Sequence, residues 1–208
     1  MNRCVIFGGG DITDYNYVLT KINCTDYIIC ADSGYKHTVR LGIKPNLAVG
    51  DFDSMEQNLV NNCEVMACSP YKDDTDTMIA VKTALQKGYT EIVLFGMLGG
   101  RFDHSIANLQ TLRYIAEHGG KAWILDLTAE ITVIINGTAK FNGDEQHSLS
   151  VFSLDEKSTG VYLQNVAYPL ENATLTAGFP LGVSNSFLKG NAVITVAEGC
   201  LAVMKCLL

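Results

Sequence analysis

Two patterns of apolar and polar positions divide the chain at about residue 130. In the first part, short apolar runs rich in β-branched residues alternate with longer stretches in which apolar residues recur at helical spacing. The runs predict buried strands at residues 5–8, 27–31, 47–50, 64–67, 92–96 and 122–125, and the longer stretches predict helices at 35–41, 75–87 and 105–118. Such alternation indicates a parallel sheet covered by helices on both faces.

The pattern changes from about Ala129 onward. Short alternating segments follow at residues 149–154, 160–163, 192–197 and 201–206, and turn pairs such as Asn136-Gly137 punctuate them. We therefore predict an α/β protein with two domains. A Rossmann-like parallel sheet with helices on both faces spans residues 1–130, and a C-terminal antiparallel β-sandwich spans residues 131–208.

Composition and charge narrow the functional classes. The chain has 208 residues, of which 48% are hydrophobic and 18% charged, so it can bury a large core. A net charge of −7, with 15 scattered Lys and Arg residues, argues against a nucleic-acid partner. No apolar run reaches membrane-spanning length, the first residues lack a secretory signal pattern, and the seven cysteines include no Cys-x-x-Cys pair. We expect a cytoplasmic protein with reduced thiols and no membrane association.

Polar and glycine-rich residues follow the predicted strands directly, at the edge where open α/β sheets bind ligands. After the strand at 47–50, Asp51 and Asp53 lie two residues apart, so both carboxylates point the same way in an extended segment. Two like charges this close are tolerated best with a cation between them, and hard oxygen ligands suit Mg²⁺, which also binds substrate phosphates. An aspartate-rich turn is the alternative, and the metal site is favoured.

The segment Lys72-Asp73-Asp74-Thr75-Asp76 opens a predicted helix. Asp73 could cap that helix, and acidic residues in a first turn complement the helix dipole. Capping explains one or two of these aspartates but explains the neighbouring lysine less well. Together with the two aspartates after the previous strand, the group forms a negative density that requires a counter-ion. The sequence leaves open whether Asp73 or Asp74 faces that ion.

Two further clusters follow strands. Asp32-Ser33-Gly34 comes after the strand at 27–31, where a helix N-cap is the alternative interpretation. Gly99-Gly100-Arg101-Phe102-Asp103-His104 comes after the strand at 92–96. Its glycines allow a close approach to a ligand, the next helix offers unpaired N–H groups to phosphate, and Arg101 can bind phosphate oxygens in a bidentate manner. A glycine turn with an exposed arginine is the alternative, and His104 alone could serve in capping or packing.

The four clusters occur in the order and spacing of the thiamine pyrophosphokinase family, which the chain resembles over nearly its whole length. Tyr168-Pro169-Leu170 and Gly182-Val183-Ser184-Asn185-Ser186 are also similar to that family's β domain. Two departures are Ser186, where bacterial members often have Glu, and Ser33, in place of a common Gly. Neither removes a carboxylate from the expected metal site.

The resemblance implies transfer of a pyrophosphoryl group from ATP to thiamine, giving thiamine diphosphate and AMP. It implies Mg²⁺ ligands at Asp51, Asp53, Asp73 and Asp76, which with Asp103, as a further ligand or base, form the expected catalytic set. Lys72 and Arg101 would balance phosphate charge, and the remaining expected contacts to nucleotide or thiamine are Asp32, Ser33, Gly34, Gly99, Gly100, His104, Ser184 and Asn185. The resemblance also implies a homodimer with active sites at the subunit interface.

Three other functions are alternatives to this one. Another magnesium-dependent phosphotransferase or pyrophosphohydrolase would act on a nucleotide without requiring thiamine. A non-catalytic nucleotide sensor would bind ATP without turnover, and it leaves the carboxylates without a purpose. A dinucleotide oxidoreductase is disfavoured because Gly8-Gly9-Gly10, after the first predicted strand, is not the G-x-G-x-x-G fingerprint.

Overall fold

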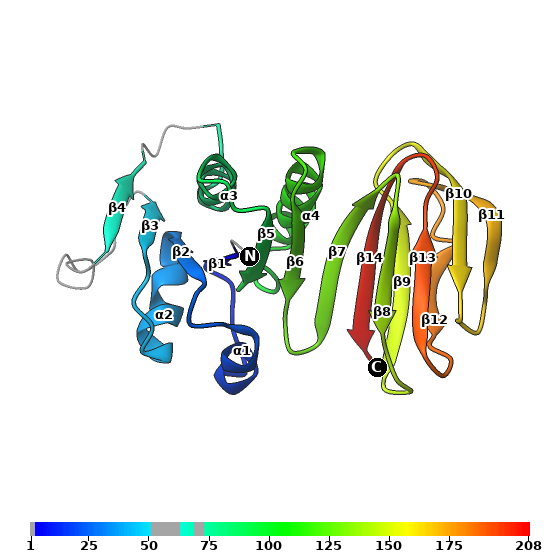
Figure 1. Cartoon of the computed structure of the whole chain (residues 1–208), viewed down its shortest axis with the longest axis horizontal. Helices are drawn as coiled ribbons and strands as arrows, with labels where there is room; N and C mark the ends of the chain where they lie inside the picture. Colours follow the sequence, from blue (N-terminus) through cyan, green and yellow to red (C-terminus); the bar gives the residue numbers. More distant parts are fainter. Residues whose placement is uncertain (1–2, 51–62, 69–72) are drawn as a thin grey trace. The chain divides into compact units, whose positions relative to one another are not determined.

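The computed structural model describes residues 3–50, 63–68 and 73–208 (Figure 1). The chain forms two compact units, Met1–Leu127 and Thr128–Leu208, called here the N-terminal unit and the C-terminal unit. Among the described residues, no helix is both long enough and apolar enough to cross a membrane. None of the seven cysteines forms a disulfide.

The strands of the N-terminal unit all run parallel to their neighbours within this unit, as the alternation of strands and helices predicts. Its strands are β1 (Arg3–Phe7), β2 (Tyr27–Ala31), β3 (Leu47–Gly50), β4 (Glu64–Ala67), β5 (Glu91–Phe95) and β6 (Lys121–Leu125). They lie in the order β6-β5-β1-β2-β3-β4, and every neighbouring pair is parallel. The chain therefore moves outward from β1 to β4 and then returns to the other side of β1 to form β5.

The helices of this unit are α1 (Tyr15–Lys21), α2 (Tyr35–Leu41), α3 (Asp76–Gln86) and α4 (Phe102–Glu117), with a short 3₁₀ helix η1 (Asp32–Gly34) before α2. Helix α1 was not predicted, because its seven residues bury only Val18 and so carry little apolar periodicity. Its start is nevertheless well defined, since the Asp14 carboxylate accepts hydrogen bonds from Asn16 N and Tyr17 N. Helix α4 begins three residues before the predicted start.

Alternate residues of the strands pack on opposite faces of the sheet. Val5 and Phe7 of β1 share a core with Val18 of α1 and with the partly buried Leu41 of α2. Cys4 and Ile6 point to the opposite face, where α3 contacts β1, β2 and β3. Figure 1 shows α1 and α2 on one side of this sheet and α3 and α4 on the other. The hydrophobic face of each helix is thus covered by the sheet.

The C-terminal unit consists of strands and turns. Its strands are β7 (Ala129–Ile135), β8 (Thr138–Asn142), β9 (His147–Ser153), β10 (Lys157–Gln164), β11 (Leu170–Thr176), β12 (Gly182–Ser186), β13 (Asn191–Thr195) and β14 (Cys200–Leu207). They form the antiparallel orders β12-β9-β14-β7 and β11-β10-β13-β8. One apolar cluster draws on both groups, with Leu149 and Val203 from the first and Leu163 and Ile194 from the second.

Candidate active site

The loops that follow β1, β2 and β5 line a pocket of about 450 Å³ together with the start of α3. Since β1 to β6 are parallel, the carboxyl ends of these strands meet at one edge of the sheet. The pocket lies where the chain direction across the sheet reverses, with β2 on one side of β1 and β5 on the other. Open α/β sheets bind ligands at such reversal points, and this volume is typical of a small-molecule site.

The loop after β1 forms one wall of the pocket through Gly9 and Gly10. Gly8 N donates to Phe95 O and Gly10 N donates to Gly96 O, each at 2.8 Å, so the loop is tied to the end of β5. A Cβ atom on Gly10 would lie 2.7 Å from Gly96 O, which is too close for any side chain. These glycines were not predicted as site residues, although they follow a strand as the predicted clusters do.

Of the predicted residues Asp32, Ser33 and Gly34, the first two line the pocket at the end of β2 and Gly34 does not. Asp32 has a φ of 50°, in the left-handed region that few non-glycine residues occupy. Gly34 is buried, and a Cβ atom there would lie 2.0 Å from Phe7 O. The structure therefore explains Gly34 by close packing against β1.

The start of α3 contributes Thr75, Asp76 and Thr77 to the pocket. Thr75, rather than Asp73, is the N-cap, because its Oγ1 accepts a hydrogen bond from Met78 N at 3.1 Å. The N–H groups of a first helical turn have no partner inside the helix and favour negative charge. The residues that follow the Thr75 cap thus present a helix N-terminus to the pocket, a feature that the sequence did not predict for this segment.

The neighbouring aspartates have different surroundings. Asp74 forms an ion pair with Lys82 Nζ at 2.6 Å, and that ammonium also lies 5.8 Å from the centre of the Tyr114 ring. Asp73 is exposed and does not belong to the lining of the pocket. Asp76 is the carboxylate of this segment that the pocket includes.

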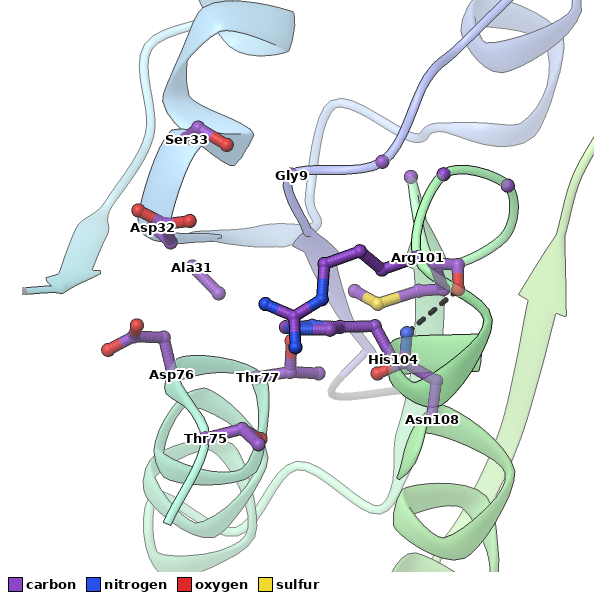
Figure 2. A pocket seen from close by; sticks show the side chains of 15 residues that line it. Gly9, Ala31, Asp32, Ser33, Thr75, Asp76, Thr77, Arg101, His104 and Asn108 are labelled. Atoms are coloured by element: carbon purple, nitrogen blue, oxygen red, sulfur yellow. Dashed lines mark hydrogen bonds between the residues drawn. The ribbon is translucent and has the colours of Figure 1, made fainter. Parts of the chain in front are cut away.

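The loop after β5 approaches the pocket with Gly96, Met97, Gly99 and Gly100. Gly96, Gly99 and Gly100 have φ values of 66°, 80° and 63°, so this path suits glycine. The buried side chain of Asn108 in α4 donates from Nδ2 to Met97 O at 2.7 Å, which is the dashed line in Figure 2. Asn108 therefore ties this loop to the helix that follows it.

Arg101 and His104 point into the pocket from the start of α4 (Figure 2). Arg101 donates from Nε and Nη2 to the two carboxylate oxygens of Asp103, at 3.1 and 2.6 Å. Asp103 also accepts from His104 N at 2.9 Å. The bonds from Arg101 lower the pKa of Asp103 below its usual value, and the same pairing raises the pKa of Arg101. Asp103 does not line the pocket, and its contacts suit it to orient Arg101.

The donor set for a metal ion is only partly described. Asp51, Asp53 and Lys72 of the predicted site lie outside the described residues. Within residues 3–50, 63–68 and 73–208, no three His, Cys, Asp or Glu side chains form a group that could hold a metal ion. Figure 2 shows the carboxylates of Asp32 and Asp76 on the same side of the pocket. Because carboxylate oxygens are hard ligands, this side of the pocket is of a type that fits Mg²⁺.

The two predicted residues of the C-terminal unit lie in β12, and they differ in exposure. Ser184 is exposed and has a φ of 57°, at an irregularity in the pairing of β12 with β9. Asn185 is buried; its Oδ1 accepts from Tyr168 N and Ser186 N at 2.9 and 3.0 Å, and its Nδ2 donates to Tyr168 O at 2.6 Å. Asn185 thus holds the backbone of Tyr168, whose side chain is 72% exposed.

The pocket brings together seven of the predicted residues, namely Asp32, Ser33, Asp76, Gly99, Gly100, Arg101 and His104. It adds residues that the sequence analysis did not assign to the site, among them Gly9, Gly10, Thr75, Thr77 and Asn108. Thr75 lies within the predicted cluster at residues 72–76, and Gly9 and Gly10 follow a predicted strand. Asn108 carried no signal, since an asparagine within an apolar helix becomes informative only when its partner is known.

Two family models match the chain. The model described as thiamin pyrophosphokinase, catalytic domain, matches residues 19–124. The model described as thiamin pyrophosphokinase, vitamin B1 binding domain, matches residues 135–201.

Relatives with similar sequences and structures agree with these matches. A thiamine pyrophosphokinase of Bacillus subtilis is 30% identical over 183 residues, covering 85% of this chain and 86% of the relative. The crystal structure of a thiamine pyrophosphokinase from the same species superposes with a TM-score of 0.89 at 26% identity, covering 99% of both chains. That of a thiamin pyrophosphokinase from Geobacillus thermodenitrificans gives a TM-score of 0.84 at 26% identity, covering 99% of this chain and 97% of the other.

Proposed function

The chain belongs to the thiamin pyrophosphokinase family, and on that premise we propose that its N-terminal pocket binds the ATP from which the enzyme transfers a pyrophosphoryl group to thiamine. The hydroxyl oxygen of thiamine forms a bond to the β-phosphorus of ATP and loses its proton. The bond from that phosphorus to the α,β-bridging oxygen breaks, and AMP leaves with the electron pair. The products are thiamine diphosphate and AMP.

The observation that carries the assignment of the pocket is the convergence of three strand ends and one helix start on a single space. Phosphates are bound well by backbone N–H groups at glycine turns and at helix N-termini. The loops at Gly9-Gly10 and Gly99-Gly100 allow the backbone to approach a ligand in the pocket closely, and the start of α3 provides a helix N-terminus. Asp32 and Ser33 supply polar side chains on the side of β2.

Arg101 is the cation that the described pocket places beside these elements. Charge builds on the phosphate oxygens during pyrophosphoryl transfer, so a guanidinium that is already oriented stabilises the transition state. Asp103 orients that guanidinium through two hydrogen bonds. His104 lies beside it as a further phosphate contact, and Lys72 is proposed to act in the same way.

The family consists of ATP-using kinases that are generally metal-dependent, and Mg²⁺ is the ion proposed for this chain. Asp51, Asp53, Asp73 and Asp76 are its proposed ligands, and Asp76 already lines the described pocket. The bound ion would neutralise phosphate charge and align the β-phosphorus with the attacking hydroxyl. The residues that line the pocket would hold the triphosphate.

The C-terminal unit is proposed to carry the thiamine contacts, in agreement with the vitamin B1 binding model that matches residues 135–201. Ser184 presents an exposed hydroxyl at β12, and Asn185 is proposed to act by shaping the backbone around Tyr168. A homodimer in the cytoplasm, with thiamine at the subunit interface, completes the proposal. Light scattering tests the dimer, and a monomer at working concentration would contradict it.

A finer description of the fold is part of the same proposal, with residues 1–130 as a Rossmann-like catalytic domain and 131–208 as a β-sandwich. The reversal of strand order at β1 supports the first description. The apolar cluster drawn from both antiparallel groups of the C-terminal unit supports the second.

The decisive experiment measures AMP release from ATP and Mg²⁺ with and without thiamine. We expect AMP and thiamine diphosphate in equal amounts, and only when thiamine is present. Release that ignores thiamine would indicate a pyrophosphohydrolase, and ATP binding without release would indicate a sensor.

A further inference from the structure

His37 in α2 is a buried polar residue that lies behind the pocket and does not line it. Its side chain is 1% exposed. Nδ1 lies 2.8 Å from the hydroxyl oxygen of Tyr15 in α1, and Nε2 lies 2.8 Å from the carbonyl oxygen of Gly10. One ring therefore joins a helix on the face of the sheet to the glycine loop that forms a wall of the pocket.

The direction of each hydrogen bond in this chain of contacts follows from the donors available. A carbonyl oxygen can only accept, so Nε2 must carry the proton that it donates to Gly10 O. In the neutral ring, Nδ1 is then the acceptor, and the hydroxyl of Tyr15 donates to it. Arg40 Nη1 donates in turn to the Tyr15 hydroxyl oxygen at 3.2 Å. Arg40, Tyr15 and His37 thus form one relay with a single orientation that ends on Gly10.

Burial favours that neutral form of the ring. It lowers the pKa of His37, as do the nearby charges of Lys36 and Arg40, while the bond to Gly10 O and the carboxylate of Asp11 oppose the shift. A neutral imidazole can accept from Tyr15 and donate to Gly10 at the same time, and an imidazolium cannot accept. The relay therefore depends on the protonation state that this environment favours.

The glycine loop has little freedom to adjust if the relay is lost. Lys36 Nζ donates to Gly9 O at 3.1 Å, and Gly10 N donates to Gly96 O at 2.8 Å. Only glycines fit between these neighbours, so a small displacement of the loop changes both the wall formed by Gly10 and the contact with the loop after β5. His37 holds the same loop through Gly10 O, whereas the loop after β5 holds it through Gly10 N.

We propose that His37 is a positioning residue for the nucleotide site, which fixes the glycine loop through Gly10 O and has its own tautomer fixed by Tyr15. The proposal rests on the assignment of the pocket to ATP. It makes the affinity for ATP depend on a side chain outside the pocket, and it leaves the affinity for thiamine independent of that side chain.

Three variants of the full chain separate positioning from general stability. His37→Leu removes both hydrogen bonds and replaces the ring with an apolar side chain of similar size. His37→Gln keeps one donor and one acceptor on a side chain that can reach the same partners. Thr38→Val is the matched control, because Thr38 is the next residue of α2 and is fully buried, and its hydroxyl bonds to Tyr35 O and Cys30 Sγ rather than to the glycine loop.

The measurement is the KM for ATP and the KM for thiamine of each variant, well below its melting temperature. We expect His37→Leu to raise the KM for ATP about five- to tenfold, the size of one lost hydrogen bond, with an unchanged KM for thiamine. His37→Gln should recover most of the loss, and Thr38→Val should change neither KM. If His37→Leu lowers kcat alone, or if His37→Gln does not recover the KM for ATP, the proposal is wrong.

A parallel variant, Arg101→Gln, tests the assignment of the pocket on which the proposal rests. If Arg101→Gln leaves kcat/KM for ATP unchanged, the pocket is not the ATP site. If Arg101→Gln lowers kcat/KM for ATP and His37→Leu does not raise the KM for ATP, the pocket assignment stands and the positioning role of His37 fails.

Discussion

The polar residues of the pocket in the N-terminal unit and those of β12 in the C-terminal unit are held in different ways. In the pocket, Arg101 and His104 are exposed side chains on a helix start, while buried neighbours such as Asn108 hold the backbone beneath them. In β12, Asn185 is itself buried and holds the backbone, and Ser184 beside it is exposed. Exposed and buried polar groups thus lie one to two turns apart on a single helix, α4, in one unit and on adjacent residues of a single strand in the other.

This difference separates two tasks that a polar residue can perform. An exposed group on a supported backbone is available to a ligand, so its loss should reduce activity and leave stability intact. A buried group that satisfies backbone atoms should affect stability first, because its removal leaves those atoms without partners. The following predictions test this division in order of expected effect.

The largest effect is expected from Asp76→Asn, which removes a proposed metal ligand at the start of α3. Turnover should fall by roughly two to three orders of magnitude, the usual result of losing one preorganised electrostatic group, with an unchanged circular dichroism spectrum. Asp74→Asn is the matched control, because Asp74 is paired with Lys82. Thiamine-dependent AMP release measures both variants. Equal losses in the two would remove the distinction between these aspartates.

A smaller loss is expected from Arg101→Gln, which removes the guanidinium that points into the pocket. We expect kcat/KM for ATP to fall about 10- to 100-fold, as for a lost hydrogen bond to a charged group. Asp103→Asn, which weakens only the orientation of Arg101, should cost less. An Asp103→Asn variant less active than Arg101→Gln would instead support a direct role of that carboxylate as a ligand or base.

In the C-terminal unit we expect the buried residue Asn185 to have a larger effect than the exposed residue Ser184, and to affect stability rather than activity. Asn185→Ala leaves the backbone N–H and C=O of Tyr168 without their partners and should lower the free energy of unfolding by about 2 kcal/mol. Ser184→Ala should change it by less than about 0.5 kcal/mol. Urea unfolding measures both. If Asn185→Ala keeps the wild-type midpoint and loses thiamine affinity, Asn185 contacts the ligand directly.

The smallest effect is a pH dependence of stability through His37. Its pKa in the folded chain is lowered from the usual 6.5, so the unfolded chain binds the proton more readily. The contribution of His37 is therefore complete above about pH 6.5 and decreases as the pH falls below that value. Melting temperatures between pH 7.5 and 5 should fall more steeply for the wild type than for His37→Gln. Parallel curves would show that His37 does not titrate differently on folding.

The sequence predicted most of the N-terminal sheet because buried parallel strands leave continuous apolar runs. The strands at 27–31, 47–50 and 64–67 have the predicted bounds. Helix α1 was missed because a single buried residue gives no periodicity. Asp32, Asp76 and Arg101 were predicted as site residues because each follows a strand or begins a helix. Such positions can be recognised from the sequence alone.

The remaining features depend on contacts between distant parts of the chain. Asn185 forms three hydrogen bonds to backbone atoms, and its neighbouring residues in the sequence do not indicate them. The same is true of His37, whose partners are 22 and 27 residues away. A local pattern cannot distinguish a polar side chain that faces a ligand from one that satisfies a backbone carbonyl. Only the fold decides between them.

The central place of β1 also has a consequence for the synthesis of the chain. β1 pairs with β2 soon after both are made, but its other partner is β5, with Arg3 opposite Glu91. At about 5–20 residues per second, the ribosome needs roughly 5–20 seconds to deliver that partner. During this interval one edge of β1 has no neighbour and can pair with other strands. The glycine loop gains its contact with Gly96 only afterwards, so the pocket proposed for ATP is complete only after β5 has been synthesised.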